Sequence, residues 1–258
     1  MSEIAEERAR MKKVLDRLAA KIGESDFRSG DPAGIVGEFD AIPGRTQLDL
    51  EIAALFVAMI SWGNRKAIRS AARRLVFEEM ESRPARYVRE GLFEGKGRGT
   101  FAKCVYRTLD FRHFQAVCRN LRAALRGRTT IESLVAGLDA PAALGVLCRI
   151  LEPANVGAPG RSPCKRISMF MRWMTRRGAP DFGIWKSRSE SDLLAVMDVH
   201  VNRQTRAMRE CRTPSWQGCL ELTSIFRSWD PVDPLKYDVA LMLLADGWDA
   251  AGPGERRG

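Results

Sequence analysis

Residues 47–61 form the stretch that most restricts how this chain folds, because the segment is apolar on nearly every side of a helix. Its apolar residues are Leu48, Leu50, Ile52, Ala53, Ala54, Leu55, Phe56, Val57, Ala58, Met59 and Ile60. A helix that is apolar all round is buried on most of its surface. Other helices must therefore surround this one, which we expect to be central.

The rest of the chain also shows helical rather than strand periodicity. No segment has the apolar–polar alternation of a half-buried strand, so we predict an all-α fold. The expected helices span 3–22, 47–61, 65–80, 83–91, 100–109, 111–126, 129–137, 141–151, 163–176, 198–209, 215–228 and 234–245. Residues 23–46 contain several glycines and prolines, and we expect a loop there.

The length and composition favour one folded unit. The chain has 258 residues, of which 45% are hydrophobic, enough to bury a substantial core. We expect a single unit over 1–258 with a helical lobe at 47–150 and a second lobe formed by 1–46 and 151–250. No apolar run is long enough to span a membrane, and the N-terminal residues are acidic where a signal peptide is basic. These features predict a cytoplasmic, nucleoid-associated protein without a membrane partner.

The charge points to a polyanionic partner. Basic residues outnumber acidic ones by 42 to 32, giving a net charge of +10, and the pI is about 9.7. Only nine of the 42 basic residues are lysines. Genomic codon bias is one explanation for this preference for arginine, but it does not explain the excess of base over acid. Arginine also suits bidentate contacts with phosphates and bases.

The cysteines and histidines do not suggest a metal site. The six cysteines include no C-x-x-C pair, and there are two histidines, His113 and His200. A structural zinc site or a four-cysteine iron–sulfur cluster is therefore not expected, and we predict no metal and no cofactor. Most of the cysteines are expected to be small buried residues.

The turn between the second and third predicted helices gathers polar and aromatic groups. Trp62 and Gly63 end one helix, and Asn64 is a suitable N-cap for the next. Arg65 and Lys66 then place two cations beside the aromatic ring. An ordinary helix–helix connection is the alternative interpretation of this turn.

Lys165 is a candidate nucleophile. Ser162 and Pro163 predict a helix start, with Ser162 as N-cap and Pro163 at the first helical position. The helix dipole and the neighbouring Arg161 and Arg166 would then lower the pKa of the lysine. A neutral amine is able to attack carbon and form a Schiff base. The alternative is a surface lysine near a helix end.

Asp198 is a candidate electrostatic partner for that lysine. It precedes Val199 and His200 at the start of a predicted helix, where an N-cap carboxylate accepts backbone N–H bonds and stays ionised. Such a group stabilises a developing positive charge. A cap without any further role is the alternative, and His200 is more suited to a supporting position than to general base catalysis.

Several motifs together resemble the helix-hairpin-helix DNA glycosylase superfamily. The order is a glycine-broken hairpin at 153–161, a helix with Lys165, and then Asp198-Val199-His200, which is similar to the Val-Asp-Val-His of eukaryotic 8-oxoguanine glycosylases. The long Lys165-to-Asp198 separation looks most like the archaeal 8-oxoguanine glycosylases. Nearly the whole chain also resembles an uncharacterised bacterial family related to them. Its marks here are Cys164-Lys165-Arg166, Arg172-Trp173-Met174, 181–186, Asp198-Val199-His200 and 233–238.

The hairpin departs from the superfamily pattern. The usual sequence has glycines on both sides of a hydrophobic residue before the lysine, whereas the segment 160–165 here has one glycine. Phosphate binding by the hairpin would then depend on arginine. The cluster cysteines of endonuclease III-like members are absent, in agreement with the cysteine spacing.

The resemblance implies base excision on a two-lobed helical fold with a helix-hairpin-helix and a cleft between the lobes. The implied partner is double-stranded DNA with a damaged base or an abasic site, bound by a monomer, and 8-oxoguanine is the implied lesion. Lys165 would attack the sugar and Asp198 would stabilise its charge, with β-elimination following. Implied recognition residues are Trp62, Asn64, Trp173, Trp185, Lys236 and Asp238. Implied DNA-backbone contacts are Gly157, Gly160, Arg161, Arg166, Arg65, Lys66 and His200.

Other interpretations remain open. A catalytically inactive DNA-binding module on a glycosylase scaffold would have the same charge and helices, although binding alone requires neither Lys165 nor Asp198. An RNA-directed role is compatible with the charge but has no RNA-binding motif to support it. For Lys236 and Asp238, a surface ion pair within one helix is the alternative to base recognition. For Trp173, whose position fits amphipathic-helix spacing, a core position is the favoured alternative.

Overall fold

Helix α4 (Gln47–Met59) is buried along almost its whole length, as predicted. Every residue from Leu50 to Met59 is at most 1% exposed. Burial includes one charged residue, Glu51, whose carboxylate accepts hydrogen bonds from the backbone N–H groups of Ile131 at 2.6 Å and Glu132 at 3.0 Å. The helix begins with a capping box between Thr46 and Asp49. The buried carboxylate thus satisfies the start of another helix in the same core.

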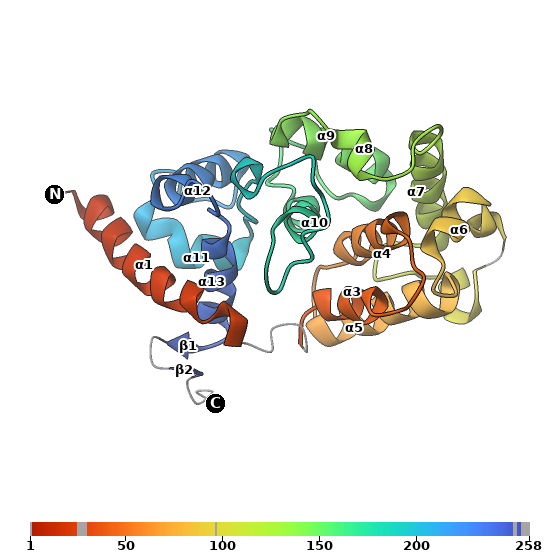
Figure 1. Ribbon diagram of the computed structural model, residues 1–258, viewed down its shortest axis with the longest axis horizontal. Coiled ribbons are helices and arrows are strands. Elements are labelled where there is room, and N and C mark those ends of the chain that lie inside the picture. The colour runs from red at the N-terminus through yellow and green to blue at the C-terminus, as the bar shows by residue number, and fades with distance from the viewer. Residues whose placement is uncertain (1, 25–29, 96, 250–251, 254–258) are drawn as a thin grey trace. The chain divides into compact units, whose positions relative to one another are not determined.

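The structure is a computed structural model that describes residues 2–24, 30–95, 97–249 and 252–253 (Figure 1). The chain divides into two units. Unit 1 consists of Met1–Ser25 and Pro159–Gly258, and unit 2 of Asp26–Ala158. The expected lobes grouped 1–46 with 151–250, whereas residues 26–46 and 151–158 fall in unit 2.

The described residues of unit 2 form helices around α4. The α-helices are α3 (Ala33–Asp40), α4, α5 (Arg65–Arg73), α6 (Pro84–Arg89), α7 (Phe111–Ala124), α8 (Glu132–Val135) and α9 (Ala140–Ile150). A π-helical segment, η2 (Arg74–Glu79), continues α5, and short 3-10 turns are η3 (Leu92–Glu94), η4 (Gly99–Ala102) and η5 (Glu152–Ala154). Asn64 caps α5 as predicted, its side chain accepting from Ala67 N at 3.1 Å.

Two predictions in unit 2 were wrong. The loop expected at 23–46 contains helix α3, whose buried residues Ile35, Val36 and Phe39 pack toward α4. The free energy of burying these few apolar residues outweighs the turn-forming tendency of the glycines around them. Residues 25–29 lie outside the described part of the chain. The helix expected at 100–109 is also absent from the described residues. After η4, Tyr106 and Leu109 form an isolated antiparallel bridge across a tight turn.

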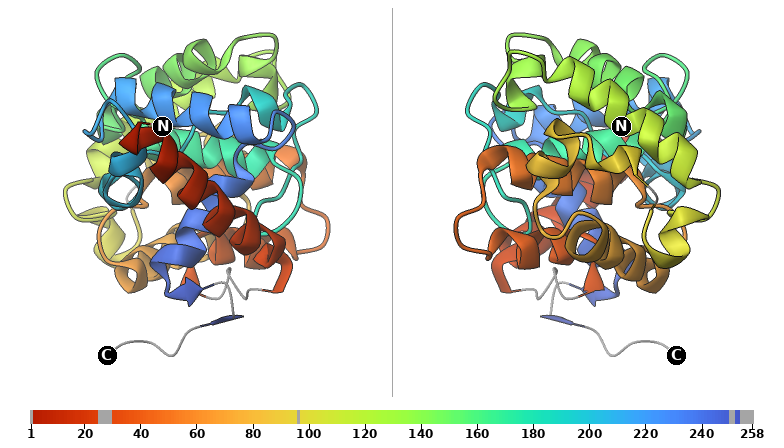
Figure 2. Two further views of the ribbon diagram at one scale, coloured as in Figure 1. Left: turned by 90° about the vertical axis from the view of Figure 1, so that its left-hand side faces the viewer. Right: turned by 90° about the vertical axis from the view of Figure 1, so that its right-hand side faces the viewer.

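Unit 1 is built on α1 and the C-terminal helices. Its elements are α1 (Glu3–Ala20), η1 (Ile22–Glu24), α10 (Lys165–Thr175), η6 (Glu190–Asp192), α11 (Val199–Thr205), η7 (Arg206–Met208), α12 (Trp216–Trp229), α13 (Lys236–Ala245), β1 (Trp248–Asp249) and β2 (Gly252–Pro253). Helix α1 crosses α13 (Figures 1 and 2), and Tyr237 donates to Asp16 at 2.8 Å where they meet. Apart from the two-residue pair β1–β2 and the isolated bridge between Tyr106 and Leu109, the described secondary structure is helical, which confirms the all-α prediction.

Candidate functional site

Lys165 and Asp198 are in direct contact within unit 1. Nζ of Lys165 lies 2.8 Å from Oδ2 of Asp198, and the two side chains are 38% and 18% exposed. Lys165 is the first residue of α10, and Asp198 is the N-cap of α11. Two helix starts therefore bring an amine and a carboxylate together at a solvent-accessible position, as the sequence motif predicted.

The two oxygens of Asp198 have separate partners. Oδ1 accepts the backbone N–H groups of His200 and Val201, each at 2.8 Å, while Oδ2 faces Lys165. Burial raises the pKa of Asp198, but the charge and hydrogen bond of Lys165 and the backbone donor of Val201 together hold it below its usual value of 3.8. Asp198 is thus an ionised group held in place by its capping role.

The start of α10 differs from the prediction at Ser162. The helix begins at Lys165, because Cys164 adopts a left-handed conformation with φ of 48° and interrupts helical geometry after Pro163. Ser162 is therefore not the N-cap, although its Oγ accepts from Cys164 N at 3.4 Å. The carbonyl of Cys164 accepts the first helical N–H groups, from Ile167 and Ser168. Lys165 is therefore the first residue of α10, whereas the prediction placed it further inside the first turn.

The residues predicted to contact the DNA backbone from unit 1 surround this start. Arg161, Gly160 and His200 are exposed, and Arg166 is half-buried. Gly160 has a positive φ of 81°. His200 Nδ1 lies 3.5 Å from a guanidinium nitrogen of Arg203. Two arginines, Arg161 and Arg166, thus lie next to Lys165 in the chain, and Arg203 follows on the helix that Asp198 caps.

Gly157, on the unit 2 side of the predicted hairpin, has a positive φ of 94°. Asn155 precedes it in a left-handed conformation, with φ of 50°. Both φ values lie in the left-handed region, which glycine adopts readily and other residues rarely.

A buried ionic network connects the elements that carry Lys165 and Asp198. Arg172 of α10 is 1% exposed; its Nη1 lies 2.6 Å from Asp238 of α13, and its Nε lies 3.1 Å from Asp181. The other oxygen of Asp238 accepts Val196 N at 3.0 Å, two residues before Asp198. Burial raises the pKa of Asp238, and the charge of Arg172 opposes that rise. The network thereby links the helix of Lys165 to the segment that leads into Asp198.

The network extends to a second arginine. Arg176 contacts Asp181 at 3.1 Å and Asp233 at 3.0 Å. Asp181 is 4% exposed, so its carboxylate is held between two guanidinium groups away from solvent. Sequence reasoning noticed Arg172, Asp181 and Asp233 as motif residues without finding this role. Their spacing gives no sign of pairing, because the partners come from separate elements.

Four predicted recognition residues are placed differently. Trp173 and Trp185 are 1% and 0% exposed, and the Trp185 ring packs edge-on against Phe170 at 5.4 Å. Neither indole has surface to offer a base, so both belong to the core instead. Asp238 is equally buried and is committed to Arg172 and Val196.

Lys236, the fourth of these residues, hydrogen-bonds Asp230 and lies over the Tyr237 ring at 5.1 Å. The alternative interpretation, a surface ion pair between Lys236 and Asp238, is therefore wrong as well. The two side chains have different partners, and Asp238 has no surface on which to form such a pair.

The predicted turn at Trp62 forms an aromatic corner in unit 2. The Arg107 guanidinium lies 4.3 Å from the centre of the Trp62 ring, and the Tyr106 ring meets it edge-on at 5.8 Å. Tyr106 also donates to the Trp62 carbonyl at 2.8 Å. Sequence reasoning missed Tyr106 and Arg107, because only the tight turn between Tyr106 and Leu109 brings them to Trp62. Asn64, Arg65 and Lys66 are exposed beside this corner.

No metal site is apparent in the described part of the chain, where no cluster of three or more His, Cys, Asp or Glu residues is placed to hold an ion. Four of the six cysteines, Cys118, Cys148, Cys164 and Cys219, are buried, as expected of small core residues. Within the described ranges, none of the helices combines the length and the apolar character of a membrane span.

Residues 31–245 match the model of a family described as "Protein of unknown function (DUF2400)". The chain belongs to the DUF2400 family. No curated protein and no solved structure matches the chain. The matched DUF2400 range includes α10 with Lys165, the cap Asp198, and Arg172 and Asp238 of the buried network.

Proposed function

We propose that this DUF2400 protein is a DNA base-excision glycosylase with AP lyase activity that acts through a Schiff base on Lys165. The observation that carries the proposal is the 2.8 Å contact between Lys165 Nζ and Asp198 Oδ2 at the ends of two helices. Forming a Schiff base requires an accessible amine, and a cationic sugar requires a fixed carboxylate nearby. The lesion, an oxidised purine with 8-oxoguanine first, follows from the resemblance to the glycosylase superfamily.

The proposed mechanism gives a role to Nζ of Lys165 and to each carboxylate oxygen of Asp198. As Lys165 Nζ bonds to C1′ of the damaged nucleotide, the C1′–N glycosidic bond breaks and the base leaves with the bonding electrons. The amine reacts in its neutral form, and the cationic adduct nitrogen then gives a proton to Oδ2 of Asp198, which passes it to the departing base. Oδ1 stays on its backbone donors, so the carboxylate keeps its position while charge develops on the sugar.

The lysine adduct then opens the sugar ring to a Schiff base. This group acidifies the C2′ protons, and loss of one of them expels the 3′ phosphate by β-elimination. Water hydrolyses the remaining imine and regenerates Lys165. No metal or cofactor is required by these steps.

The DNA-binding part of the proposal rests on charge. Arg161 and Arg166 flank Lys165, and the whole chain carries a net charge of +10. In unit 2, the Trp62 ring with its stacked Arg107 offers the kind of surface on which bases stack. A helix-hairpin-helix with two lobes and a cleft, a monomeric state, duplex DNA as partner and a nucleoid location are parts of the same proposal.

Borohydride trapping tests the proposal. The protein is incubated with duplexes that contain 8-oxoguanine, other oxidised bases or an abasic site, and borohydride reduces any Schiff base to a stable adduct seen on a denaturing gel. We expect an adduct with the wild type and with Lys186→Gln, which removes an exposed lysine of the same unit. We expect none with Lys165→Gln.

The outcomes separate the enzyme from its rival. Absence of an adduct on every lesion, or an adduct that survives Lys165→Gln, would exclude this mechanism. Duplex binding that is tight and unchanged by Lys165→Gln, without any adduct, would instead favour the inactive DNA-binding module.

A further inference from the structure

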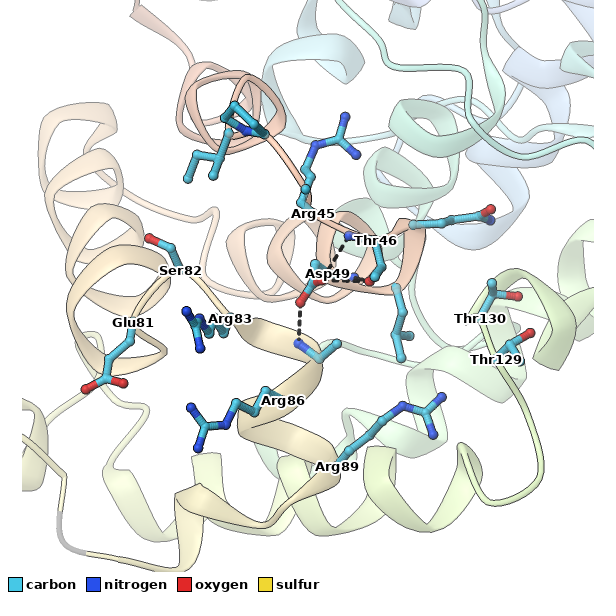
Figure 3. Close-up of a pocket in the computed structure, with 16 residues that line it drawn as sticks. Arg45, Thr46, Asp49, Glu81, Ser82, Arg83, Arg86, Arg89, Thr129 and Thr130 are labelled. Carbon is cyan, nitrogen blue, oxygen red and sulfur yellow. Dashed lines mark hydrogen bonds between the residues drawn. The ribbon is translucent and has the colours of Figure 1, made fainter.

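A cavity of about 930 Å³ lies entirely within unit 2 (Figure 3). One wall is the segment 42–49 that leads into α4. The other is the turn at 81–83 with the following helix α6, and Thr129 and Thr130 complete the lining. The cavity contains none of the residues used in the proposed function, and its size is in the range of small-molecule sites.

The lining of the cavity is strongly cationic. Four arginines line it, Arg45, Arg83, Arg86 and Arg89, against two carboxylates, Asp49 and Glu81. Asp49 is occupied by the capping box with Thr46 and by Ala85 N at 2.9 Å. Glu81 forms its ion pair with Arg98, outside the lining. Among the described residues, neither carboxylate forms an ion pair with an arginine of the cavity lining.

The arginines differ in how firmly they are held. Within the part of the chain that the structure describes, the Arg83 guanidinium has no hydrogen-bond or ion-pair partner. Arg86 pairs with Glu90, and both side chains are about half exposed, at 48% and 54%. Such exposed pairs contribute little free energy, so Arg86 is readily available to another anion. Arg89 donates to the Arg128 carbonyl, and Arg45 is paired with Asp40.

The backbone before Arg83 is strained. Glu81 and Ser82 have positive φ values of 51° and 56°, although neither is a glycine. Two consecutive left-handed residues reverse the chain after η2 and bring Arg83 to the start of α6. In Figure 3 the side chains of Arg83 and Arg86 extend to one side of this helix, while Arg89 extends to the other, toward Thr129 and Thr130.

We propose that this cavity binds a phosphate-bearing ligand, with Arg83 and Arg86 as its principal contacts. Guanidinium groups match phosphate oxygens in bidentate geometry. A ligand with at least two negative charges would pair with Arg83, which has no carboxylate partner among the described residues, and with Arg86 in place of its exposed partner Glu90. The chemistry fits a free pyrophosphate-containing molecule as well as the backbone of nucleic acid. The inference does not depend on Lys165 or on the proposed function.

Titration of the full-length chain with inorganic pyrophosphate at low ionic strength tests the site. We expect Arg83→Gln and Arg86→Gln each to weaken binding about tenfold, the value of one charge-assisted contact, and Arg83→Lys to weaken it less. Arg112→Gln removes an exposed arginine of the same unit outside the cavity and should change the affinity less than about twofold. Thermal melting of each variant establishes that it is folded.

A second titration with undamaged duplex DNA identifies the source of the phosphate. Weakening of pyrophosphate binding alone indicates a small ligand, and weakening of both with a smaller salt dependence indicates a nucleic acid backbone. The site is refuted if the wild type does not bind pyrophosphate, or if Arg112→Gln weakens binding as much as Arg83→Gln. Lys165→Gln should bind pyrophosphate like the wild type, so the result stands apart from the trapping experiment.

Discussion

Lys165 Nζ lies 2.8 Å from Asp198 Oδ2, and the same aspartate uses its other oxygen to cap the helix that it begins. The carboxylate therefore has a structural role and a proposed chemical role that different substitutions separate. Asp198→Asn retains an oxygen that accepts the backbone N–H bonds, whereas Asp198→Ala loses it.

For Asp198 we expect stability and reactivity to respond differently. Asp198→Ala should lower the free energy of unfolding by about 1 kcal/mol more than Asp198→Asn does, as measured by urea denaturation. Both variants should slow borohydride trapping on an abasic duplex by about 100-fold or more, because both remove the negative charge. Trapping at the wild-type rate in Asp198→Asn would contradict the charge role.

The buried network predicts a large effect at Arg172. Arg172→Met leaves Asp238 and Asp181 without the guanidinium between them, both in the core. We expect a loss of about 3–5 kcal/mol in the free energy of unfolding. Arg177→Met is the control, since Arg177 is 61% exposed in its pair with Glu190 and should change stability by at most about 1 kcal/mol. Equal effects of the two substitutions would contradict the structural role of the network.

We predict that position 63 requires glycine, because of its backbone conformation and because Arg107 lies close to it. Its φ is 98°, and a Cβ there would lie 2.2 Å from Nη1 of Arg107. Gly63→Ala should therefore destabilise the protein by about 1–3 kcal/mol and displace Arg107 from the Trp62 ring.

Gly127→Ala is the matched control for Gly63→Ala. Gly127 also has a positive φ, 69°, but a Cβ there would meet nothing within 4 Å. We expect a larger decrease in the melting temperature for Gly63→Ala. Equal decreases would mean that torsional strain alone accounts for the effect and that Arg107 moves aside without cost.

Asp230 should contribute to the pH dependence of stability. The hydrogen bond from Lys236 lowers the pKa of Asp230 to about 2, below the value near 3.9 of an unfolded chain. The folded state then binds fewer protons at this site, so the stabilisation is fully present above about pH 4 and is lost as pH falls through about 2.

Thermal melting between pH 7 and pH 2 tests this contribution. Asp230→Asn and Lys236→Gln should each lose less stability on acidification than the wild type does, because the first removes the pKa difference and the second reduces it, leaving only the backbone donors of Val232 and Asp233. Profiles that run parallel to the wild type in both variants would show that the pair contributes nothing to acid sensitivity.

The features that were predictable depend on residues close together in the chain. The burial of α4 follows from its apolar side chains, and the caps Asn64 and Asp198 act on N–H groups within the next turn. The prediction of Ser162 as an N-cap was wrong, because the left-handed conformation of Cys164 delays the helix start to Lys165. Cysteine is not a residue whose presence signals such a conformation.

The amino-acid sequence by itself determined that the chain is helical, strongly basic and furnished with a lysine and an aspartate at two helix starts. Only the tertiary structure decided that these two groups touch, that Trp185 is a core residue, and that Arg172 is paired with Asp238. Helix starts and apolar faces arise from interactions within a few residues. Contacts between separate elements depend instead on which faces pack together, and many weak long-range interactions decide that packing jointly.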